Sequence, residues 1–115
     1  MVKNYSFIQK YSFKIILLLA AIIFNSQLFS EFEVVYKSIL NLPTIANLHL
    51  ANSMSVRYAN FINLSEEQNG VEVFANRGTS GIDGSTSTAI GHSLCDEKLN
   101  ILITGDVAFF YDSNA

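Results

Sequence analysis

A chain of 115 residues is long enough for one folded domain and too short for two of ordinary size. Half of the residues are hydrophobic and only 15% are charged, which excludes an intrinsically disordered chain. Residues 31–115 carry all ten acidic side chains against four basic ones, and this acidic balance argues against nucleic acid as a partner. A single cysteine, Cys95, excludes an internal disulfide and is expected to be a small buried side chain.

The first 28 residues, here called the head, differ in composition from the rest of the chain. Three lysines, Lys3, Lys10 and Lys14, precede ten uninterrupted apolar residues, Ile15 to Phe24. As a helix this run spans roughly 15 Å, about half of a hydrocarbon core, so it is too short to cross a bilayer. The pattern resembles a secretory signal, although no A-x-A cleavage site follows. Two alternatives stay open: a signal-like, membrane-associated segment of an exported protein, and a buried helix.

The next elements are an amphipathic helix, a strand and a second helix. Apolar spacing over Glu31–Leu42 predicts the first helix, which Pro43 ends. Ile45–Leu50 suits a short strand, and Asn52 or Ser53 can cap the helix that follows. The residues expected to share the apolar face of that second helix are Met54, Tyr58, Phe61 and Ile62.

The second half of the chain holds two more strands with a helix between them. Val71–Phe74 is a predicted strand that follows a turn. Asp83 is a good N-cap for a helix running to about Leu94. Leu99–Thr104 is a continuously apolar run, typical of a strand buried on both faces.

This order of elements predicts an α/β fold, a partial parallel sheet flanked by helices. The sheet is expected to have three strands, with one edge of the last strand left without a neighbour. Ligands of such sheets bind beyond the carboxyl ends of the strands. Polar clusters follow Leu50, Ala75 and Thr104, so we expect the three clusters to converge at one edge of the sheet.

The cluster after Ala75 contains Gly78, Gly81 and Gly84, in a G-x-x-G-x-x-G pattern that matches neither a dinucleotide fingerprint nor a P-loop. Glycines permit close approach of a ligand to the backbone, and a helix beginning near Asp83 would offer free N–H groups to a phosphate. The equally weighted alternative is that the glycines only build a sharp turn between strand and helix.

Charged side chains in the three clusters suggest a site for an anion and a cation. Asp106, directly after Gly105, is placed to bind Mg²⁺, although a G-D pair often ends a strand without any metal. Arg57 lies on a polar helix face with Ser53 and could receive a carboxylate, or this face is simply solvated. Arg77 could bind a carboxylate in the same way. The chain's two histidines, His49 and His92, have no partner at metal-binding spacing and are expected to be structural.

Three segments together resemble one enzyme family: LANSMSVRYA (Leu50–Ala59), FANRGTSGIDGSTSTAIG (Phe74–Gly91) and ILITGDVAFFYDSNA (Ile101–Ala115). The family is that of the 2-succinyl-5-enolpyruvyl-6-hydroxy-3-cyclohexene-1-carboxylate (SEPHCHC) synthases of menaquinone biosynthesis. The resemblance covers residues 29–115 and implies a partial, Rossmann-like domain that binds thiamine diphosphate. It also implies a cytoplasmic, homo-oligomeric transferase that joins 2-oxoglutarate to isochorismate with loss of CO₂.

The resemblance also implies roles for single residues. Asp106 matches a ligand of Mg²⁺ or Mn²⁺, and Ile82 matches the bulky residue that supports the bent cofactor. The full set of implied cofactor-binding residues is Gly78, Gly81, Ile82, Gly105 and Asp106. The implied substrate-binding residues are Ser53, Arg57 and Arg77.

The sequence departs from the family in two respects. The family's second metal ligand is an asparagine farther beyond the G-D pair than this chain extends, and Asn114 is too close to Asp106 to replace it. The family's amino-terminal domain, which supplies a catalytic glutamate, has no counterpart here. We therefore expect a truncated cofactor-binding domain that is inactive alone. The alternative is a small secreted or membrane-tethered α/β protein that binds anions without catalysis.

Overall fold

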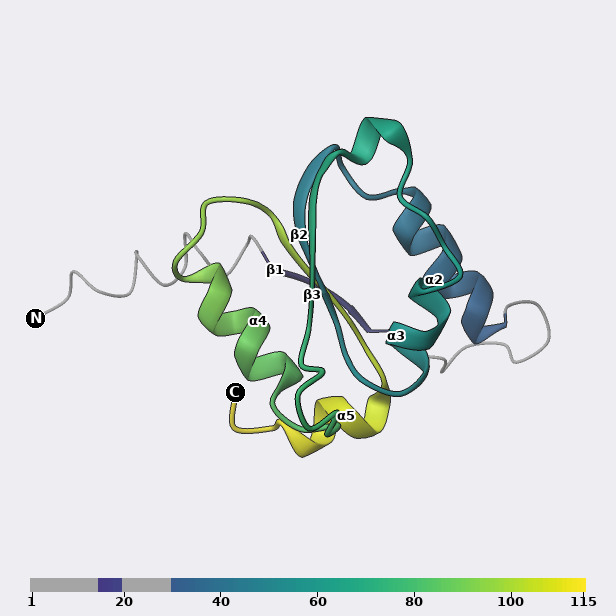
Figure 1. Ribbon diagram of the computed structural model, residues 1–115. Helices are drawn as coiled ribbons and strands as arrows, with labels where there is room; N and C mark the ends of the chain where they lie inside the picture. The colour runs from purple at the N-terminus through teal and green to yellow at the C-terminus, as the bar shows by residue number, and fades with distance from the viewer. Residues whose placement is uncertain (1–14, 20–29) are drawn as a thin grey trace, which may run out of the picture.

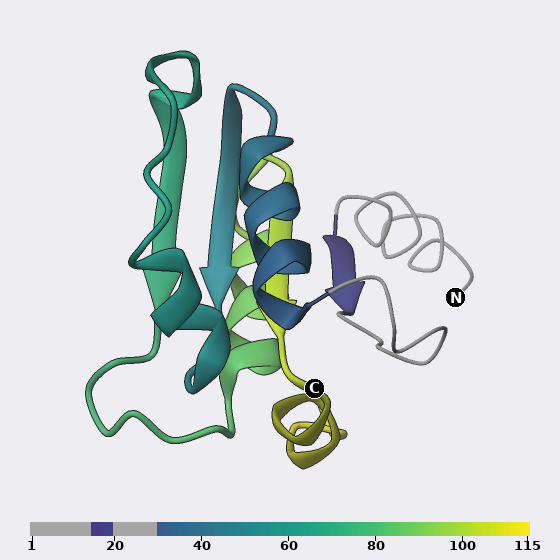
Figure 2. The same ribbon diagram turned by 90° about the vertical axis from the view of Figure 1, so that its right-hand side faces the viewer.

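The computed structural model describes residues 15–19 and 30–115. Four parallel strands form one sheet in the order β1-β4-β2-β3, with α2 and α3 on one face and α4 on the other (Figures 1 and 2). This confirms the predicted α/β fold with a parallel sheet between helices. The elements are β1 (Ile15–Leu19), α2 (Glu31–Leu40), β2 (Ile45–Leu50), α3 (Met54–Ala59), the 3₁₀ helix η1 (Glu66–Gln68), β3 (Gly70–Ala75), α4 (Ser85–Ser93), β4 (Asn100–Thr104) and α5 (Asp106–Tyr111).

The apolar run of the head contributes a strand, so the alternative of a buried helix is wrong over Ile15–Leu19. This strand, β1, pairs in parallel with β4, from Ile15 opposite Asn100 to Leu19 opposite Thr104. The prediction that β4 lacks a neighbour on one side is therefore also wrong, and β3 is an edge strand (Figure 2). An unpaired strand edge is a template for any β-compatible segment, and an Ile- and Leu-rich run suits that position.

The rest of the predicted apolar run, residues 20–24, and the three lysines before it lie outside the described residues. Among residues 15–19 and 30–115, no helix has the length and apolar character that crossing a membrane requires.

Helix α2 begins and ends with side-chain caps. The Ser30 hydroxyl accepts a hydrogen bond from the Glu33 amide at 3.2 Å, which satisfies one free donor of the first turn. At the other end the Asn41 side chain donates to the Lys37 carbonyl at 2.7 Å. The helix therefore ends at Leu40, two residues before the predicted end.

The hydrophobic core lies between the sheet and the helices α2 and α3. Strand residues of alternating position point toward this face, because side chains along a strand alternate between its two sides. The buried residues of this core are Val35, Ile39, Leu42, Ala46, Leu48, Leu50, Val56, Val71, Ile101 and Ile103. Strand β2 is buried from Ala46 to Leu50, as expected for a strand with helices on both faces.

The face of the sheet covered by α4, here called the polar face, contains several buried polar side chains. Asn47 donates to Asp96 Oδ2 at 3.0 Å and to Asn100 Oδ1 at 3.3 Å. Thr104 is also buried on β4. The predicted strand 99–104 is thus buried as expected, but one of its faces is held by hydrogen bonds in addition to apolar contacts.

The apolar face predicted for the second helix is partly wrong. Helix α3 ends at Ala59, so Phe61 lies beyond it and is 80% exposed. Val56, which was not predicted to face the core, is buried there. The reason is that the chain leaves the helix in a turn, in which the Phe61 amide donates to the Tyr58 carbonyl, and the periodicity of 3.6 residues stops.

Three further local predictions need correction. Gly84, not Asp83, is the N-cap of α4, and its φ of 81° is a left-handed conformation that favours glycine. Helix α5 begins at Asp106, directly after β4, where no helix was predicted. Cys95 is exposed, because α4 has ended and the chain turns toward β4.

Candidate functional site

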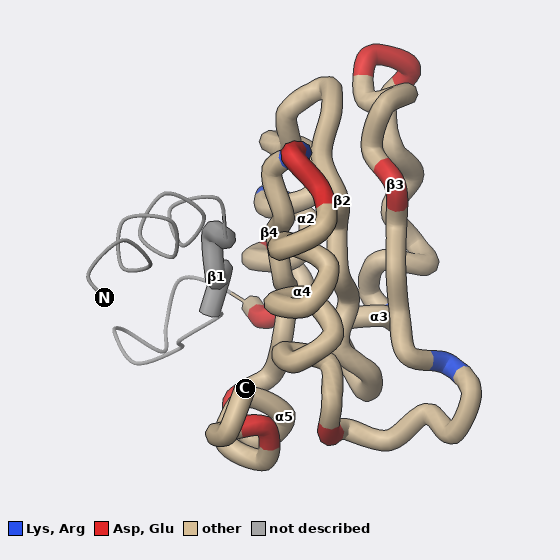
Figure 3. Tube along the Cα trace, turned by 90° about the vertical axis from the view of Figure 1, so that its left-hand side faces the viewer, with Lys and Arg blue, Asp and Glu red and all other residues tan. Residues whose placement is uncertain are grey.

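The three polar clusters lie at one end of the sheet, beyond the carboxyl ends of β2, β3 and β4. The loop 76–84, the start of α3 and the helix α5 all lie at this end (Figures 1 and 2). The loop after β3 carries a basic position, and α5 carries acidic positions at the same end (Figure 3). The predicted convergence is therefore present at the level of the backbone.

One buried amide holds the loop 76–84 in place. Asn52 is 3% exposed, and its Nδ2 donates to the Asn76 carbonyl at 2.7 Å and to the Gly81 carbonyl at 2.6 Å. Its Oδ1 accepts a hydrogen bond from Arg77 Nη1 at 2.8 Å. The sequence suggested Asn52 only as a helix cap. Its place directly after β2, at the carboxyl end of the sheet, was the only signal for this role.

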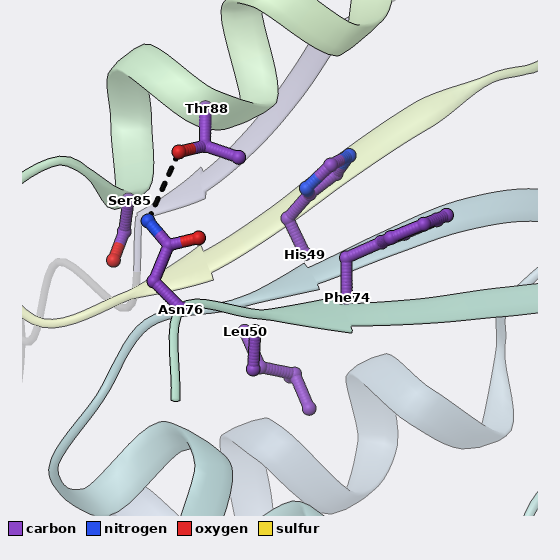
Figure 4. A pocket seen from close by; sticks show the side chains of 7 residues that line it. His49, Leu50, Phe74, Asn76, Ser85 and Thr88 are labelled. Atoms are coloured by element: carbon purple, nitrogen blue, oxygen red, sulfur yellow. Dashed lines mark hydrogen bonds between the residues drawn. The ribbon is translucent and has the colours of Figure 1, made fainter. Parts of the chain in front are cut away.

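A second amide joins the loop to the first turn of α4. Asn76 Nδ2 donates to Thr88 Oγ1 at 2.9 Å and to the Gly84 carbonyl at 3.3 Å (Figure 4). The Thr88 hydroxyl in turn donates to the Gly84 carbonyl at 2.8 Å. The loop is therefore anchored by side chains at its beginning and at its end.

A small pocket lies between Asn76 and α4, on the polar face (Figure 4). It encloses about 10 Å³, which is at most the room for one water molecule, so it is not a cofactor site. The hydroxyls of Ser85 and Thr86 are buried near this helix start and have no hydrogen-bond partner among the described residues. The residues that line the pocket are His49, Leu50, Phe74, Ala75, Asn76, Ser85 and Thr88.

The start of α4 is capped by a carboxylate of the chain, which contradicts the predicted free N–H groups. Asp112 Oδ2 accepts from the Ser87 amide at 2.7 Å, and Oδ1 accepts from the Ser87 hydroxyl at 2.7 Å. Partial burial alone would raise the pKa of Asp112. Hydrogen bonds from Ser87 and from the Thr86 and Gly84 amides lower it by more, so the pKa lies below its ordinary value. A phosphate at this helix end would have to displace Asp112.

Replacing Asp112 with asparagine should lower the free energy of unfolding near pH 7 by about 1 kcal/mol, because α4 loses a charged cap. The lowered folded pKa means that this contribution is present above the ordinary value of 3.8 and is lost as the pH falls through the folded pKa. Urea unfolding near pH 7 and near pH 3 should therefore show a smaller difference from the unaltered chain at the lower pH. Asp83→Asn, an exposed change of equal charge, is the control, and an equal cost there would contradict the capping role.

Asp106 is exposed at the first position of α5, and its Oδ1 accepts from the Val107 amide at 2.8 Å. The carboxylate is therefore available at the carboxyl end of the sheet and is not buried in the core. Within residues 15–19 and 30–115, no group of three or more His, Cys, Asp or Glu side chains could hold a metal ion. Asp106 could thus supply one oxygen ligand to a cation, whose other ligands would have to come from elsewhere.

Ser53 and Arg57 are both exposed at the start of α3. Ser53 is the N-cap residue, but its side chain makes no capping hydrogen bond, so the predicted capping role is wrong. Its φ of 77° and ψ of −130° are costly for a residue with a side chain, about 1–3 kcal/mol. The Arg57 guanidinium makes no ion pair or hydrogen bond with another described residue, whereas Arg77 is held by Asn52.

The other predicted cofactor residues lie in the same region. Ile82 and Gly81 are half-buried in the loop, and a Cβ at Gly81 would come within 2.6 Å of the Asp83 carboxylate. A Cβ added at Gly78 or Gly105 would meet no atom within 4 Å. Packing within the described chain therefore does not require glycine at Gly78 or Gly105.

The two histidines contact each other, a pairing that the sequence did not reveal. His49 is 3% exposed, and its Nε2 lies 3.3 Å from His92 Nδ1 and 3.1 Å from Asn100 Oδ1. The His49 ring stacks on Phe74 with 5.1 Å between centroids. Burial lowers the pKa of His49, the Asn100 hydrogen bond opposes this, and the charge of His92 lowers the pKa further. These contacts agree with a structural role on the polar face.

Curated proteins provide a close match to most of the chain, although no protein-family model matches it. It is 57% identical over 91 residues to the SEPHCHC synthase of Cytophaga hutchinsonii, which covers 79% of this chain and 16% of the relative. The SEPHCHC synthases of Flavobacterium johnsoniae and Bacteroides fragilis are 52% and 51% identical over 87 residues, 76% of this chain and 15% of each relative. The chain thus spans about one sixth of the length of these relatives. With its α/β fold and polar loop at the carboxyl end of a parallel sheet, it belongs to the SEPHCHC synthase family and matches a segment of that larger enzyme.

Proposed function

We propose that residues 29–115 are part of the thiamine-diphosphate-binding domain of an enzyme that joins 2-oxoglutarate to isochorismate with decarboxylation, in menaquinone biosynthesis. The observation that carries this proposal is that the loop 76–84 and the Asp106 carboxylate lie at the same end of the parallel sheet, in a chain 57% identical to a SEPHCHC synthase. Ligands of parallel sheets bind at this end. The intact enzyme is proposed to be a homo-oligomer.

The residues of this end fit a diphosphate and its metal ion in part. Mg²⁺ prefers oxygen ligands and is often bound by one or two carboxylates together with phosphate oxygens and water, so the exposed Asp106 suits one position. Mn²⁺ accepts the same kind of ligands. Gly78 and Gly105 have open space where a Cβ would stand, which leaves room for a ligand to approach the backbone. We propose that these three residues, with Gly81 and Ile82, contact the cofactor.

The substrates are carboxylates, and the arginines at this end suit them. Arg77 lies in the loop 76–84, and Arg57 lies on the exposed side of α3 with a free guanidinium among the described residues. A guanidinium can bind a carboxylate through two parallel hydrogen bonds. We propose that both arginines bind substrate carboxylates. Ser53, whose strained backbone exposes the hydroxyl beside α3, would contribute a further hydrogen bond.

Catalysis requires more than this chain. Thiamine diphosphate supplies the electron sink for decarboxylating a 2-oxo acid, while the protein must bind it, orient it and place the substrates. Asp106 would supply only one metal ligand, and the relatives are about six times as long as the matched segment. We therefore propose that the chain binds the cofactor weakly and is inactive unless the remaining parts of the enzyme are supplied.

Calorimetry with thiamine diphosphate and Mg²⁺ tests this proposal on the full chain. We expect weak binding that requires the metal, and at least a tenfold loss in Asp106→Asn, because the amide removes the negative charge that the cation needs. Glu66→Gln removes an exposed carboxylate from η1, at the opposite end of the sheet, and should bind as the unaltered chain does.

Two results of this experiment would count against the proposal. Binding that persists after chelation of the metal would indicate a general anion site, in agreement with the alternative of a non-catalytic anion-binding protein. Equal losses in Asp106→Asn and Glu66→Gln would show that the effect comes from net charge and not from a metal ligand.

A further inference from the structure

The Asn52 side chain uses both of its functional atoms at the loop 76–84. Its amide nitrogen donates to the Asn76 and Gly81 carbonyls, at 2.7 and 2.6 Å, so a single group joins two points of the loop that are five residues apart. Its carbonyl oxygen accepts from Arg77 at 2.8 Å. A primary amide offers two donors and one acceptor oxygen, and Asn52, which is buried, uses all three at once.

The bond from Arg77 to Asn52 restricts a side chain that would otherwise be mobile. An exposed arginine has about 2 kcal/mol of rotamer entropy to lose when it binds a ligand. Asn52 occupies only one nitrogen, Nη1, and a guanidinium has five N–H donors, so a face of the group stays free for a carboxylate. Arg77 has therefore already lost part of its rotamer entropy before any ligand binds, so less is lost on binding.

The chemical type of the Asn52 acceptor is important for this role. A neutral amide oxygen orients the guanidinium and leaves its positive charge available to an incoming anion. A carboxylate at the same position would form an ion pair with Arg77 and compete with the anion. No acidic side chain forms an ion pair with Arg77 among the described residues.

The backbone next to Asn52 is strained, which fits a fixed position for its side chain. Ser53 has a φ of 77°, a conformation that a residue with a Cβ adopts only when surrounding contacts impose it. The three hydrogen bonds of Asn52 supply such contacts directly before Ser53.

We infer that Asn52 is the positioning residue of this site: it holds Arg77 with its charge unneutralised, ready for a carboxylate of a 2-oxo dicarboxylic acid, and fixes the loop 76–84 around it. The choice of this ligand class rests on the proposed function. The positioning itself rests on the contacts of Asn52 alone.

Two measurements on the full chain test the positioning by Asn52 and the ligand class separately. Nitrogen NMR of the Arg77 guanidinium, with hydrogen exchange of the amides 78–84, reports the positioning without any ligand. In Asn52→Ala we expect a mobile Arg77 side chain and at least tenfold faster exchange in the loop. Asn60→Ala, at the exposed C-terminal end of α3, is the matched control and should leave both unchanged.

Titration with 2-oxoglutarate reports the ligand. We expect about tenfold weaker binding in Asn52→Ala, and an equal or larger loss in Asn52→Asp, where the carboxylate neutralises Arg77 and can no longer donate to the Asn76 and Gly81 carbonyls. Because Asn52 acts through Arg77, Asn52→Ala should cause no further loss in a chain that already carries Arg77→Ala. If Asn52 had only a general structural role, Asn52→Ala would weaken binding equally in chains with and without Arg77→Ala.

The failures can be told apart. If the unaltered chain does not bind 2-oxoglutarate, the proposed ligand class is wrong, and the NMR measurements still decide the role of Asn52. If Asn52→Ala leaves Arg77 and the loop as ordered as before, the positioning role is wrong, whatever binds. If Asn52→Ala does not fold, the nitrogen NMR of the unaltered chain provides the decision, because an Arg77 guanidinium that is already mobile there contradicts the inference.

Discussion

Replacing Leu48 with alanine should lower the free energy of unfolding by about 3 kcal/mol, within the range of 2–5 kcal/mol for such core changes. Leu48 is 1% exposed and lies in β2, which pairs with both β3 and β4. A half-open, mainly apolar pocket of about 90 Å³ already lies beside Leu48 and Ile39, so the substitution would deepen an existing gap in the packing instead of allowing the core to close. A domain of this size is stabilised by about 5–15 kcal/mol in all, so the loss is a large share.

Urea unfolding of the full chain measures this change, with Ile45→Ala as the control. Ile45 is in the same strand but 60% exposed, and its truncation should cost less than about 1 kcal/mol. A loss at Leu48 no larger than that at Ile45 would mean that the sheet does not pack against α2 as described. The comparison therefore tests the core that positions the carboxyl ends of the strands.

The strands of the core were predictable because their signal is local. Val71–Phe74 and Leu99–Thr104 show the short apolar runs of buried strands, and the intervening helices follow from spacing and from Pro43. A parallel sheet requires such crossovers, so the topology followed from the order of elements. The carboxyl ends of the parallel strands were therefore expected to lie at one edge of the sheet, and the structure confirms this.

The head was harder because a short apolar run has no period. Ile15–Leu19 satisfies the pattern of a buried helix and that of a buried strand equally. What distinguishes them is the edge of β4 that would otherwise be unpaired, 85 residues later in the chain (from Ile15 to Asn100). Helix α5 was missed for a different reason: six residues are too few to show a helical period.

The polar contacts of the site could not be read from the sequence, since each joins distant segments. Asn52 contacts residues 24 to 29 positions away, and Ser87 and Asp112 are 25 positions apart. Glycine and hydroxyl composition correctly indicated an unusual loop after β3. It did not indicate that Asn52 holds this loop, or that Asp112 occupies the helix start where one of the two interpretations placed a phosphate.

The two faces of the sheet contribute differently to the site: one supplies stability, and the other fixes the positions of the loop and the helix start. The apolar face with α2 and α3 supplies most of the stability through burial of groups such as Leu48 and Ile103. The polar face with α4 fixes the loop and the helix start through hydrogen bonds of Asn76 and Asp112. A buried polar face is stable only while its groups keep the protonation states that their partners require.

Acidification should therefore destabilise the chain through His49. Burial lowers the folded pKa of His49 below its ordinary value of 6.5, so the unfolded state takes up the proton first. The contribution of neutral His49 is complete above about pH 6.5 and falls as the pH decreases, by at most about 1.4 kcal/mol for each pH unit. Between pH 7.5 and pH 5 we therefore expect a progressive loss of stability.

The groups that face His49 allow this effect to be separated from others. His92 lies beside it on α4, Asn100 on β4 and Phe74 on β3, and Asp96 is the nearest carboxylate beyond His92, 3.7 Å from its Nε2. A hydrogen bond from Asn47 is the main reason that the pKa of Asp96 is lowered, so its contribution is lost only below its ordinary value of 3.8, outside this range.

Urea unfolding at several pH values between 5 and 7.5 measures the slope, and His49→Gln should flatten it because the titrating ring is removed while a polar group remains. The comparison uses the slope and not the absolute stability, so a general cost of the substitution does not affect the result. His92→Gln controls for the loss of the neighbouring charge, and it should leave the part of the slope caused by burial of His49. An unaltered slope in His49→Gln would show that the pH dependence comes from other groups and that His49 is not held neutral on the polar face.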